Sequence, residues 1–491
     1  MSQISVNDLT FHYDGSYDNV FEHVSFSVDS DWKLGFVGRN GRGKTTFLKL
    51  LTGELDSAGS IVSDVPFDYF PFPVPDASKT TQAVFEEVSH APLWMLEKEL
   101  NRLEVDLCVL DRAFSTLSPG EQTKVLLAAL FCKPGFFLLI DEPTNHLDME
   151  ARALVSRYLN GKKGFILVSH DRAFLDGCVD HILSINRADI EVQKGNFTSW
   201  EENRRRRDAF ELAENTRLVR QVSRLQTVAR RTAEWSDRVE ASKIGRGSVE
   251  GTADRGAIGH KSAKMMKRAK SVEKRRESAI REKEALLRNL ERNDTLKIAP
   301  LTHHSDLLVE ALDLSVTYGG RTVCGPLNFT VRQGQRLALC GKNGSGKSSI
   351  VRLLTGEPVP HAGRLRTASG LIVSYMPQDT SFLKGTVLEF ARANGLDETL
   401  FLTILRKLDF PRVQFEKDMR DFSGGQKKKA LLAKTLSERA HLYVWDEPLN
   451  FVDVLSRMQV RDLLLQGNPS MLFVEHDRAF LDEIATDVIQ L

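Results

Sequence analysis

The chain has 491 residues, of which 41% are hydrophobic and 27% charged, and its formal net charge is +1. That length is too great for one hydrophobic core, so we expect two or three domains. The five cysteines form no CxxC pair, which argues against a disulfide framework or a zinc site and favours a reducing compartment. The N-terminus lacks a signal-peptide profile, and the most apolar stretch is too broken to cross a bilayer. We therefore expect a cytoplasmic protein.

The charge is unevenly distributed along the chain. Residues 201–290 carry 24 Lys and Arg against 14 Asp and Glu, a balance of +10, which leaves −9 for the remainder. Such asymmetry suggests a polyanionic partner. The alternative is a solvated helical surface that binds nothing.

The first strong motif follows an apolar stretch. Residues 4–13 alternate apolar and polar as a half-buried strand does, and residues 33–37 read as a buried strand. A full GxxxxGK[ST] match then begins at Gly38, typical of a phosphate-binding loop before a helix. In that interpretation Lys44 reaches the β- and γ-phosphates and Thr45 joins the Mg²⁺ shell. The alternative is a plain glycine turn between strand and helix.

A second apolar strand, residues 136–140, ends in two carboxylates. Asp141 would support Mg²⁺ and Glu142 would polarise the attacking water. Alone the pair could be a strand-end cap, but Pro143 to Asp148 follow it as PTNHLD, which makes the motif more specific.

The chain also carries a signature loop, LSPGEQ at residues 117–122, and a switch-histidine motif, VSHD at residues 168–171. All these motifs stand in the order of an ABC ATPase domain, and the chain resembles that family. The resemblance implies that Tyr13 stacks on adenine. It also implies that Ser118 and Gly120 contact the γ-phosphate of ATP held by the opposite domain, and that His170 senses that phosphate.

All the landmarks recur later in the chain. Tyr318 lies 305 residues after Tyr13, Asp446 lies 305 after Asp141, and His476 lies 306 after His170. So constant an offset indicates a duplication, hence two ATPase domains.

The residues that this resemblance assigns fall into three groups. Contacts to ATP are expected from Tyr13, Gly38, Asn40, Gly41, Gly43, Lys44, Thr45 and Thr46, from Tyr318, Gly341, Asn343, Gly344, Gly346, Lys347, Ser348 and Ser349, and from the signatures through Ser118, Gly120, Ser423 and Gly425. Mg²⁺ is expected near Thr45, Asp141, Ser348, Gln378 and Asp446. The catalytic residues are expected to be Glu142, Glu447, His170, His476 and Gln378.

The two copies differ where the chemistry is expected. Phe72 stands where the second copy has Gln378, and Pro119 replaces a signature glycine and removes a backbone donor. Ser169 before the first switch histidine becomes Glu475 before the second. Because each ABC site combines the phosphate loop of one copy with the signature of the other, we expect two unequal sites. The sequence leaves open which is slower.

The basic middle segment has helical spacing, with apolar residues such as Leu218, Val222 and Leu225 on a thin seam. Five glycines between Lys243 and Gly259 predict a bend, so we expect an antiparallel helical hairpin. The expected domains are residues 1–199, a linker at 200–300 with its tip near 241–260, and residues 301–491. Contact with the phosphate groups of a polyanionic partner is expected from Lys243, Arg246, Lys261, Lys264, Lys267 and Arg268.

This arrangement resembles the ABC-F family, and most closely its Lsa-type antibiotic-resistance proteins, through segments such as Trp32–Gly35, Asp208–Asn215 and Thr302–His304. The resemblance implies an α/β fold with two ABC-type ATPase domains in tandem joined by a long α-helical hairpin linker. It implies a monomer with ATP and Mg²⁺ as cofactors. That monomer would bind the ribosome at the tRNA exit site, beside 23S rRNA and the P-site tRNA.

The implied function is ATP-dependent ribosome protection. The protein would displace lincosamide, streptogramin A or pleuromutilin drugs from the peptidyl-transferase centre and be released by ATP hydrolysis. One alternative is a housekeeping ABC-F translation factor that acts on stalled ribosomes. Another is the ATPase subunit of a drug exporter, against which the long basic linker argues.

Overall fold

The structure is a computed structural model. It describes residues 2–13, 19–145, 147–186, 189–211, 297–319, 321–342 and 344–491, with scattered positions between 213 and 279. The chain divides into two compact units: Met1–Thr198 with Asn293–Leu491, and Ser199–Arg292. The first unit contains both copies of the duplicated half.

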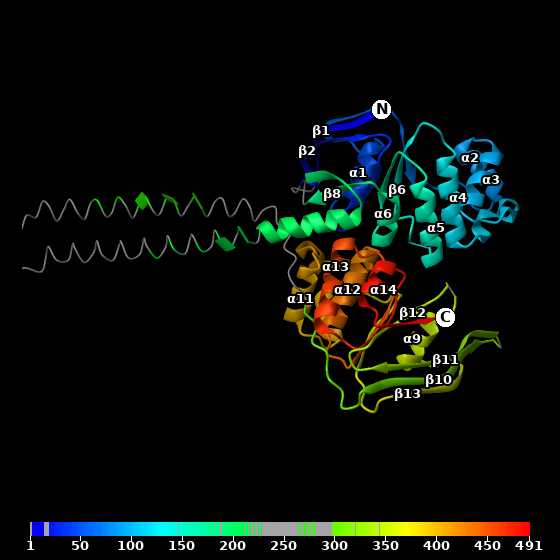
Figure 1. Ribbon diagram of the computed structural model, residues 1–491, viewed down its shortest axis with the longest axis vertical. Helices are drawn as coiled ribbons and strands as arrows, with labels where there is room; N and C mark the ends of the chain where they lie inside the picture. Colours follow the sequence, from blue (N-terminus) through cyan, green and yellow to red (C-terminus); the bar gives the residue numbers. More distant parts are fainter. Residues whose placement is uncertain are drawn as a thin grey trace, which may run out of the picture. The chain divides into compact units, whose positions relative to one another are not determined.

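The first copy, whose strands β6 and β8 are labelled in Figure 1, is built on a six-stranded sheet with the order β5-β6-β7-β3-β8-β9. Its strands are β3 (Lys33–Val37), β5 (Phe67–Phe70), β6 (Phe137–Asp141), β7 (Phe165–Val168), β8 (His181–Asn186) and β9 (Asp189–Lys194). The strands from β5 to β8 are parallel, and β9 is antiparallel. The central strands read as short continuous apolar runs because parallel sheets are covered on both faces.

A second, antiparallel sheet with the order β2-β1-β4 packs over this core. Its strands are β1 (Gln3–Phe11), β2 (Phe21–Asp29) and β4 (Ala58–Ser63). The helices of the first copy are α1 (Lys44–Leu51), α2 (Thr81–Ser89), α3 (Leu93–Arg102), α4 (Pro119–Phe131), α5 (Met149–Asn160) and α6 (Arg172–Cys178). Phe47 of α1 contacts the rings of Phe21 and Phe36, which fixes α1 between the two sheets.

The second copy repeats this plan. Its parallel sheet has the order β14-β15-β16-β12-β17, which matches β5-β6-β7-β3-β8 strand for strand. The strands are β12 (Arg336–Cys340), β14 (Val373–Met376), β15 (Leu442–Asp446), β16 (Met471–Val474) and β17 (Asp487–Gln490), and the antiparallel sheet β11-β10-β13 consists of β10 (Leu307–Tyr318), β11 (Arg321–Arg332) and β13 (His361–Thr367). The helices are α9 (Lys347–Leu354), α10 (Val387–Ala393), α11 (Glu398–Lys407), α12 (Gly424–Ser437), α13 (Val454–Gly467) and α14 (Arg478–Ile484). The predicted duplication and α/β class are confirmed.

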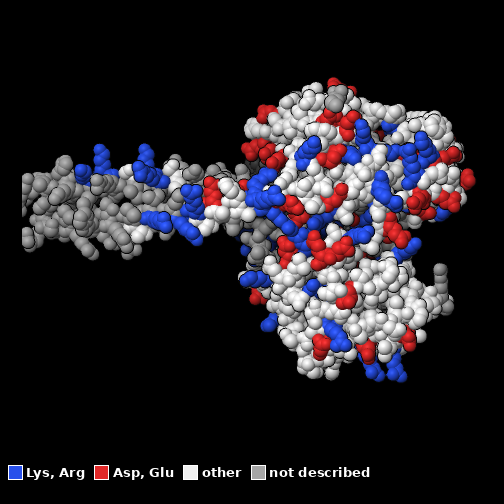
Figure 2. Space-filling model, viewed as in Figure 1, with Lys and Arg blue, Asp and Glu red and all other residues white. Residues whose placement is uncertain are grey.

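The unit from Ser199 to Arg292 is described only in part. Residues 197–211 are helical, as are the described positions that follow them up to residue 279. Basic side chains outnumber acidic ones among these positions (Figure 2). Lys264 and Lys267 are helical and exposed, whereas Lys243, Arg246, Lys261, Arg268 and the predicted tip at 241–260 lie outside the described residues.

Candidate functional site

The candidate site lies at the carboxyl edge of the first parallel sheet. Strands β3, β6 and β7 end together there, because β3 and β6 both pair in parallel with β7. In parallel α/β sheets this edge is where ligands bind. The loops that leave these strands therefore bring the phosphate loop, the paired carboxylates and the switch histidine to one place.

The phosphate loop has the backbone that a glycine-rich anion cradle requires. Gly43 has φ +92°, and a Cβ there would lie 2.5 Å from Val20 Cγ1. Lys44 Nζ donates to the carbonyl oxygens of Gly38 at 2.8 Å and Arg39 at 3.2 Å, and to Asn40 Oδ1 at 3.3 Å. The ammonium group is thus folded back over the loop, where it can bind the phosphates of a nucleotide at the N-terminus of α1.

The two carboxylates at the end of β6 have different neighbours. Asp141 Oδ2 accepts hydrogen bonds from Thr45 Oγ1 at 2.9 Å and from the Tyr69 hydroxyl at 3.0 Å. Glu142 has φ +51°, a left-handed backbone that is unusual for a non-glycine residue. Its carboxylate faces His170, with Nε2 and Oε1 3.1 Å apart. Asp141 is therefore placed beside the phosphate-loop hydroxyl, and Glu142 beside the switch histidine.

Burial governs the charges in this site. It raises the pKa of Glu142 to about 8, and the neighbouring Asp141 adds to that shift. Burial also raises the pKa of Asp141 and lowers the pKa of Lys44. The pKa of His170 is lowered well below its ordinary value by burial and then by the charge of Lys44. A bound cation would stabilise the ionised carboxylates, and an anionic ligand would stabilise the charged ammonium group of Lys44.

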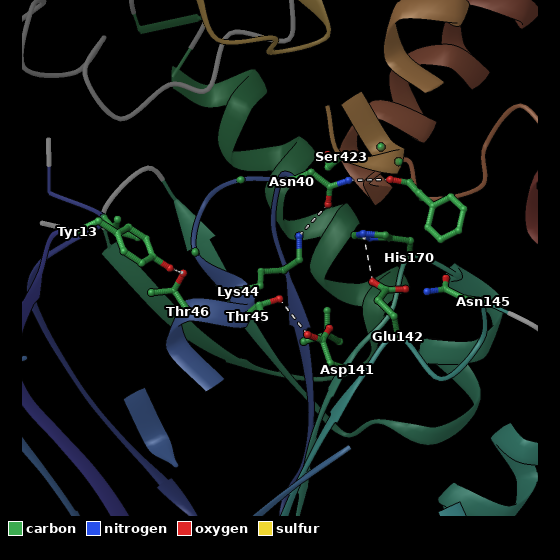
Figure 3. A pocket seen from close by; sticks show the side chains of 17 residues that line it. Tyr13, Asn40, Lys44, Thr45, Thr46, Asp141, Glu142, Asn145, His170 and Ser423 are labelled. Atoms are coloured by element: carbon green, nitrogen blue, oxygen red, sulfur yellow. Dashed lines mark hydrogen bonds and ion pairs between the residues drawn. The ribbon is translucent and has the colours of Figure 1, made fainter. Parts of the chain in front are cut away.

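The second copy completes this site. A cavity of about 490 Å³ is lined by both copies, and Figure 3 shows its lining side chains around Lys44. From the first copy come Tyr13, Asn40, Gly41, Gly43, Lys44, Thr45, Thr46, Asp141, Glu142, Asn145 and His170, and from the second Ser423, Gly424, Gly425 and Phe451. The sequence-predicted partners Lys44, Glu142, His170 and Ser423 therefore line one cavity.

Tyr13 lies at the edge of the cavity. Its hydroxyl shares a hydrogen bond of 2.7 Å with Thr46 Oγ1, and its ring contacts Phe11 edge-on. The residue is 47% exposed at the edge of the cavity, where an aromatic ring can stack on a flat partner such as a purine base. Its counterpart Tyr318 has a similar hydrogen bond, in which its hydroxyl donates to Ser349 Oγ at 3.2 Å.

The second copy arranges its equivalent residues in the same pattern. Lys347 Nζ donates to the carbonyl oxygens of Gly341 and Lys342, both at 2.8 Å. Burial raises the pKa of Asp446, and the neighbouring Ser348 hydroxyl opposes that shift. Glu447 has φ +49°, which matches the strained backbone of Glu142.

The carboxylate of Glu447 is held by more donors than that of Glu142. Gln378 Nε2 donates to Glu447 Oε2 at 2.7 Å, and Asn450 Nδ2 donates to the same oxygen at 2.5 Å. His476 Nε2 lies 3.3 Å from Glu447 Oε1. Burial alone would raise the pKa of Glu447, but the hydrogen bond from His476, its charge and the hydrogen bond from Gln378 outweigh burial, so the pKa is lowered.

The signature residues of the first copy are placed at the start of α4. Ser118 caps this helix: its hydroxyl oxygen accepts from the Glu121 backbone N–H at 3.3 Å, and its own backbone N–H donates to Glu121 Oε2 at 2.8 Å. Pro119 occupies the first turn, where a helix has no internal use for the missing N–H. Gly120 follows it in the same turn. Asn343, expected in the second phosphate loop, lies outside the described residues.

The donor set fits Mg²⁺ together with a nucleotide. Asp446 Oδ1 is buried without a hydrogen-bond partner, and the Ser348 hydroxyl lies beside that carboxylate. Within the described ranges no group of three or more His, Cys, Asp or Glu could hold a metal ion by itself. A hard cation held by one carboxylate and one hydroxyl takes its remaining oxygen ligands from phosphates and water. In the first copy Asp141 and Thr45 would hold Mg²⁺, and in the second copy Asp446 and Ser348 would do so. The cation would neutralise charge on the phosphates.

Two features of the site have no counterpart in the sequence prediction. Tyr69 donates to Asp141, although the motif order assigns it no role. Arg42 lies 3.1 Å from Asp409 Oδ2 of the second copy, and Arg39 lies 3.9 Å from the same oxygen. The signal for Tyr69 is its position at the end of the strand next to β6. No spacing in the sequence points to Asp409, since its partners lie more than 300 residues away.

The comparison with known proteins now decides the family. The profile of the ABC transporter family matches residues 21–145 and 324–450. The chain belongs to the ABC transporter family. It carries the family's ATPase domain twice, and it is an ATPase that uses ATP and Mg²⁺. Within the described part of the chain, no helix combines the length and apolar composition that a membrane crossing requires.

Several curated proteins resemble this ABC ATPase along nearly its whole length. Ribosome protection protein VmlR of Bacillus subtilis (strain 168) is 28% identical over 480 residues, which cover 96% of this chain and 84% of that protein. ATP-binding protein Uup of Caulobacter vibrioides is 29% identical, with 96% and 74% covered. Energy-dependent translational throttle protein EttA of Haemophilus influenzae is 28% identical, with 96% and 89% covered. These relatives confirm the predicted resemblance to the ABC-F family.

Two solved structures share the fold of this ABC ATPase. The archaeal ribosome recycling factor aABCE1, in complex with the ribosomal stalk protein aP1, has a TM-score of 0.65 at 20% identity. That match covers 98% of this chain and 87% of the other. The RNase-L inhibitor has a TM-score of 0.63 at 20% identity, with 99% and 87% covered. The predicted fold of two ABC-type ATPase domains in tandem is thereby confirmed.

Proposed function

We propose that the protein is an ATP-dependent ribosome-binding factor that protects the peptidyl-transferase centre against antibiotics. The observation that carries this proposal is the similarity to ribosome protection protein VmlR, which extends over 96% of this chain. Lincosamides, streptogramin A compounds and pleuromutilins are the drugs that its ABC-F resemblance suggests. We propose that it acts in the cytoplasm as a monomer whose two ATPase domains pair with each other.

The basic segment between the ATPase domains is the proposed ribosome-contacting part. We take the first domain as residues 1–199, the linker as residues 200–300 and the second domain as residues 301–491. The described lysines Lys264 and Lys267 are exposed on a helical stretch, where their charge is available to rRNA phosphates. The linker would enter the tRNA exit site beside the P-site tRNA, with its tip near 23S rRNA.

The proposed cycle couples nucleotide to ribosome binding. ATP would bind between the phosphate loop of one copy and the signature of the other, as in the cavity that contains Lys44 and Ser423. Closure around ATP would favour the ribosome-bound form, and hydrolysis would release the protein. Glu142 and Glu447 are the proposed bases that accept a proton from the attacking water.

Replacing both bases tests this cycle. In Glu142→Gln with Glu447→Gln, hydrolysis should fail while ATP still binds, so the double variant should co-sediment with ribosomes when ATP is present. A Lys44→Ala, Lys347→Ala variant, which lacks the phosphate ligands, is the matched control and should stay in the ribosome-free fraction. Recovery of the Gln variant in ribosome-free fractions alone would refute the proposal.

A second candidate function is a housekeeping translation factor for stalled ribosomes. The similarity to translational throttle protein EttA, at the same 28% identity, supports it. The two functions differ in drug susceptibility. Expression of a resistance factor raises the minimal inhibitory concentration of at least one of the three drug classes, whereas a housekeeping factor leaves all three unchanged.

A further inference from the structure

Glu475 is a buried acidic residue beside the nucleotide site of the second copy, the one with Lys347. It directly follows β16, and only 3% of the residue is exposed. A buried carboxylate is costly unless its oxygens accept hydrogen bonds and a positive charge lies nearby. Here Oε1 accepts from the Leu449 N–H at 2.8 Å, Oε2 accepts from the His476 N–H at 3.0 Å, and the positive charge of Arg457 stabilises the carboxylate.

The two backbone donors belong to two different loops of this site. Leu449 lies in the loop that follows β15, and His476 lies in the loop that follows β16. The two strands are paired in parallel, and their pairing ends near the Glu447 N–H, which donates to the Val474 carbonyl oxygen at 3.0 Å. Beyond that point the carboxylate of Glu475 bonds the two loops to each other.

The same two loops carry the groups that face each other in the site. His476 Nε2 lies 3.3 Å from Glu447 Oε1, and Asn450 Nδ2 donates to Glu447 Oε2 at 2.5 Å. Leu449 stands between Glu447 and Asn450 in the sequence. A displacement of either loop would therefore change how the switch histidine faces the proposed base.

The first copy has a different pair of residues at these two positions. Glu475 corresponds to Ser169, and Leu449 corresponds to Thr144. The two hydroxyl groups of the first copy share a hydrogen bond of 3.3 Å, and Ser169 Oγ also accepts from the Asp171 N–H at 3.2 Å. In the second copy leucine supplies no hydroxyl, and the longer side chain of Glu475 reaches the backbone N–H instead.

We propose that Glu475 is a positioning residue of the second nucleotide site. Its carboxylate holds the Glu447–Asn450 loop and the switch histidine at a fixed separation, so that His476 faces the γ-phosphate while Glu447 faces the attacking water. Catalytic groups are effective only when the surrounding residues hold them close to the productive geometry. Glu475 therefore acts on the binding of the γ-phosphate and on hydrolysis, and has little effect on the binding of the rest of the nucleotide.

Nucleotide binding to the purified full-length protein, without ribosomes, tests this role independently of the ribosomal function proposed above. Glu475→Gln keeps the volume but loses one acceptor, because a glutamine amide presents N–H groups to the second backbone donor. In a Lys44→Ala background, which weakens binding at the first site, Glu475→Gln should weaken binding of non-hydrolysable β,γ-imido-ATP about three- to tenfold and of ADP less than about twofold. Equal losses for the two nucleotides, or no loss, would overturn the proposal, because a merely structural role would affect both alike.

Steady-state ATP turnover in the otherwise unchanged chain supplies a second readout. Glu475→Ser removes the carboxylate and should lower kcat at least about twofold. Adding Leu449→Thr restores the hydroxyl pair of the first copy and should recover about half of the lost kcat. A double variant no faster than Glu475→Ser would contradict the proposed role. Thermal melting checks that each variant is folded, and the double variant carries the residue pair with which the first copy folds.

Discussion

The pair Lys429–Asp453 offers the sharpest test of what holds the second copy together. Lys429 Nζ lies 2.7 Å from Asp453 Oδ2, and the two side chains are 4% and 0% exposed. Lys429 also donates to the Leu408 carbonyl oxygen at 2.9 Å, while Asp453 accepts from the Ser456 backbone and caps α13. Both charged groups are therefore buried and bonded to other groups of the protein.

Lys429→Met removes one charge and leaves the other buried. Breaking such a pair costs about 3–5 kcal/mol because the remaining carboxylate loses its nearest cation in a low-dielectric site. For a domain of this size that loss lowers the melting temperature of the second copy by about 10 °C. Differential scanning calorimetry of the nucleotide-free chain measures it.

The duplicated chain supplies its own control. Lys124 is the counterpart of Lys429 in the first copy and is only partly buried, so Lys124→Met should shift the melting temperature by no more than about 2 °C. Adding Asp453→Asn to Lys429→Met should recover part of the loss, since asparagine keeps the helix cap without the buried charge. A loss below about 1 kcal/mol in Lys429→Met would refute the reasoning.

Two further predictions concern the first site. Gly425→Ala places a Cβ 2.5 Å from the Phe451 carbonyl oxygen and 2.8 Å from Asn40 Nδ2, so it should weaken nucleotide binding in a fluorescence titration. Gly424→Ala is the control: its Cβ lies 3.5 Å from the Phe451 side chain, so this variant should bind nucleotide nearly as the wild type does. Glu142 has a pKa raised from 4.5 to about 8, so its contribution to stability is full below about pH 4.5 and is lost as the pH rises through 8. Glu142→Gln should therefore gain melting temperature relative to the wild type across that window, and a constant difference would contradict the raised pKa.

Much of the fold could be predicted because each motif occupies a fixed place in it. The apolar run at residues 33–37 followed by glycines predicts β3 and α1, and the structure places them at Lys33–Val37 and Lys44–Leu51. The run before Asp141 predicts β6 in the same way. A short apolar run bounded by glycine and charged residues is compatible with few structures other than a buried strand. Because the motifs recur in the second copy, each prediction has two independent supports in the sequence.

The contacts between the copies could not be predicted in the same way. The bridge from Arg42 to Asp409 depends on a loop beyond α11, where Asp409 has a left-handed backbone at φ +57°. Such a contact depends on how two folded surfaces meet, and local periodicity carries no record of it. The same holds for Asn40 and the Phe451 carbonyl, because a backbone acceptor has no residue-type signature.

The backbone at the two proposed catalytic glutamates has a consequence for the stability of each copy. Glu142 and Glu447 both hold positive φ angles, +51° and +49°, in a region that costs an L-residue about 1–2 kcal/mol and glycine almost nothing. Glycine at either position would relieve that strain and remove the carboxylate. Each copy thus loses some folding stability by having glutamate at a position where the backbone conformation favours glycine. The positive φ angle at both positions is therefore a cost of placing a carboxylate in the nucleotide sites and not a requirement of the fold.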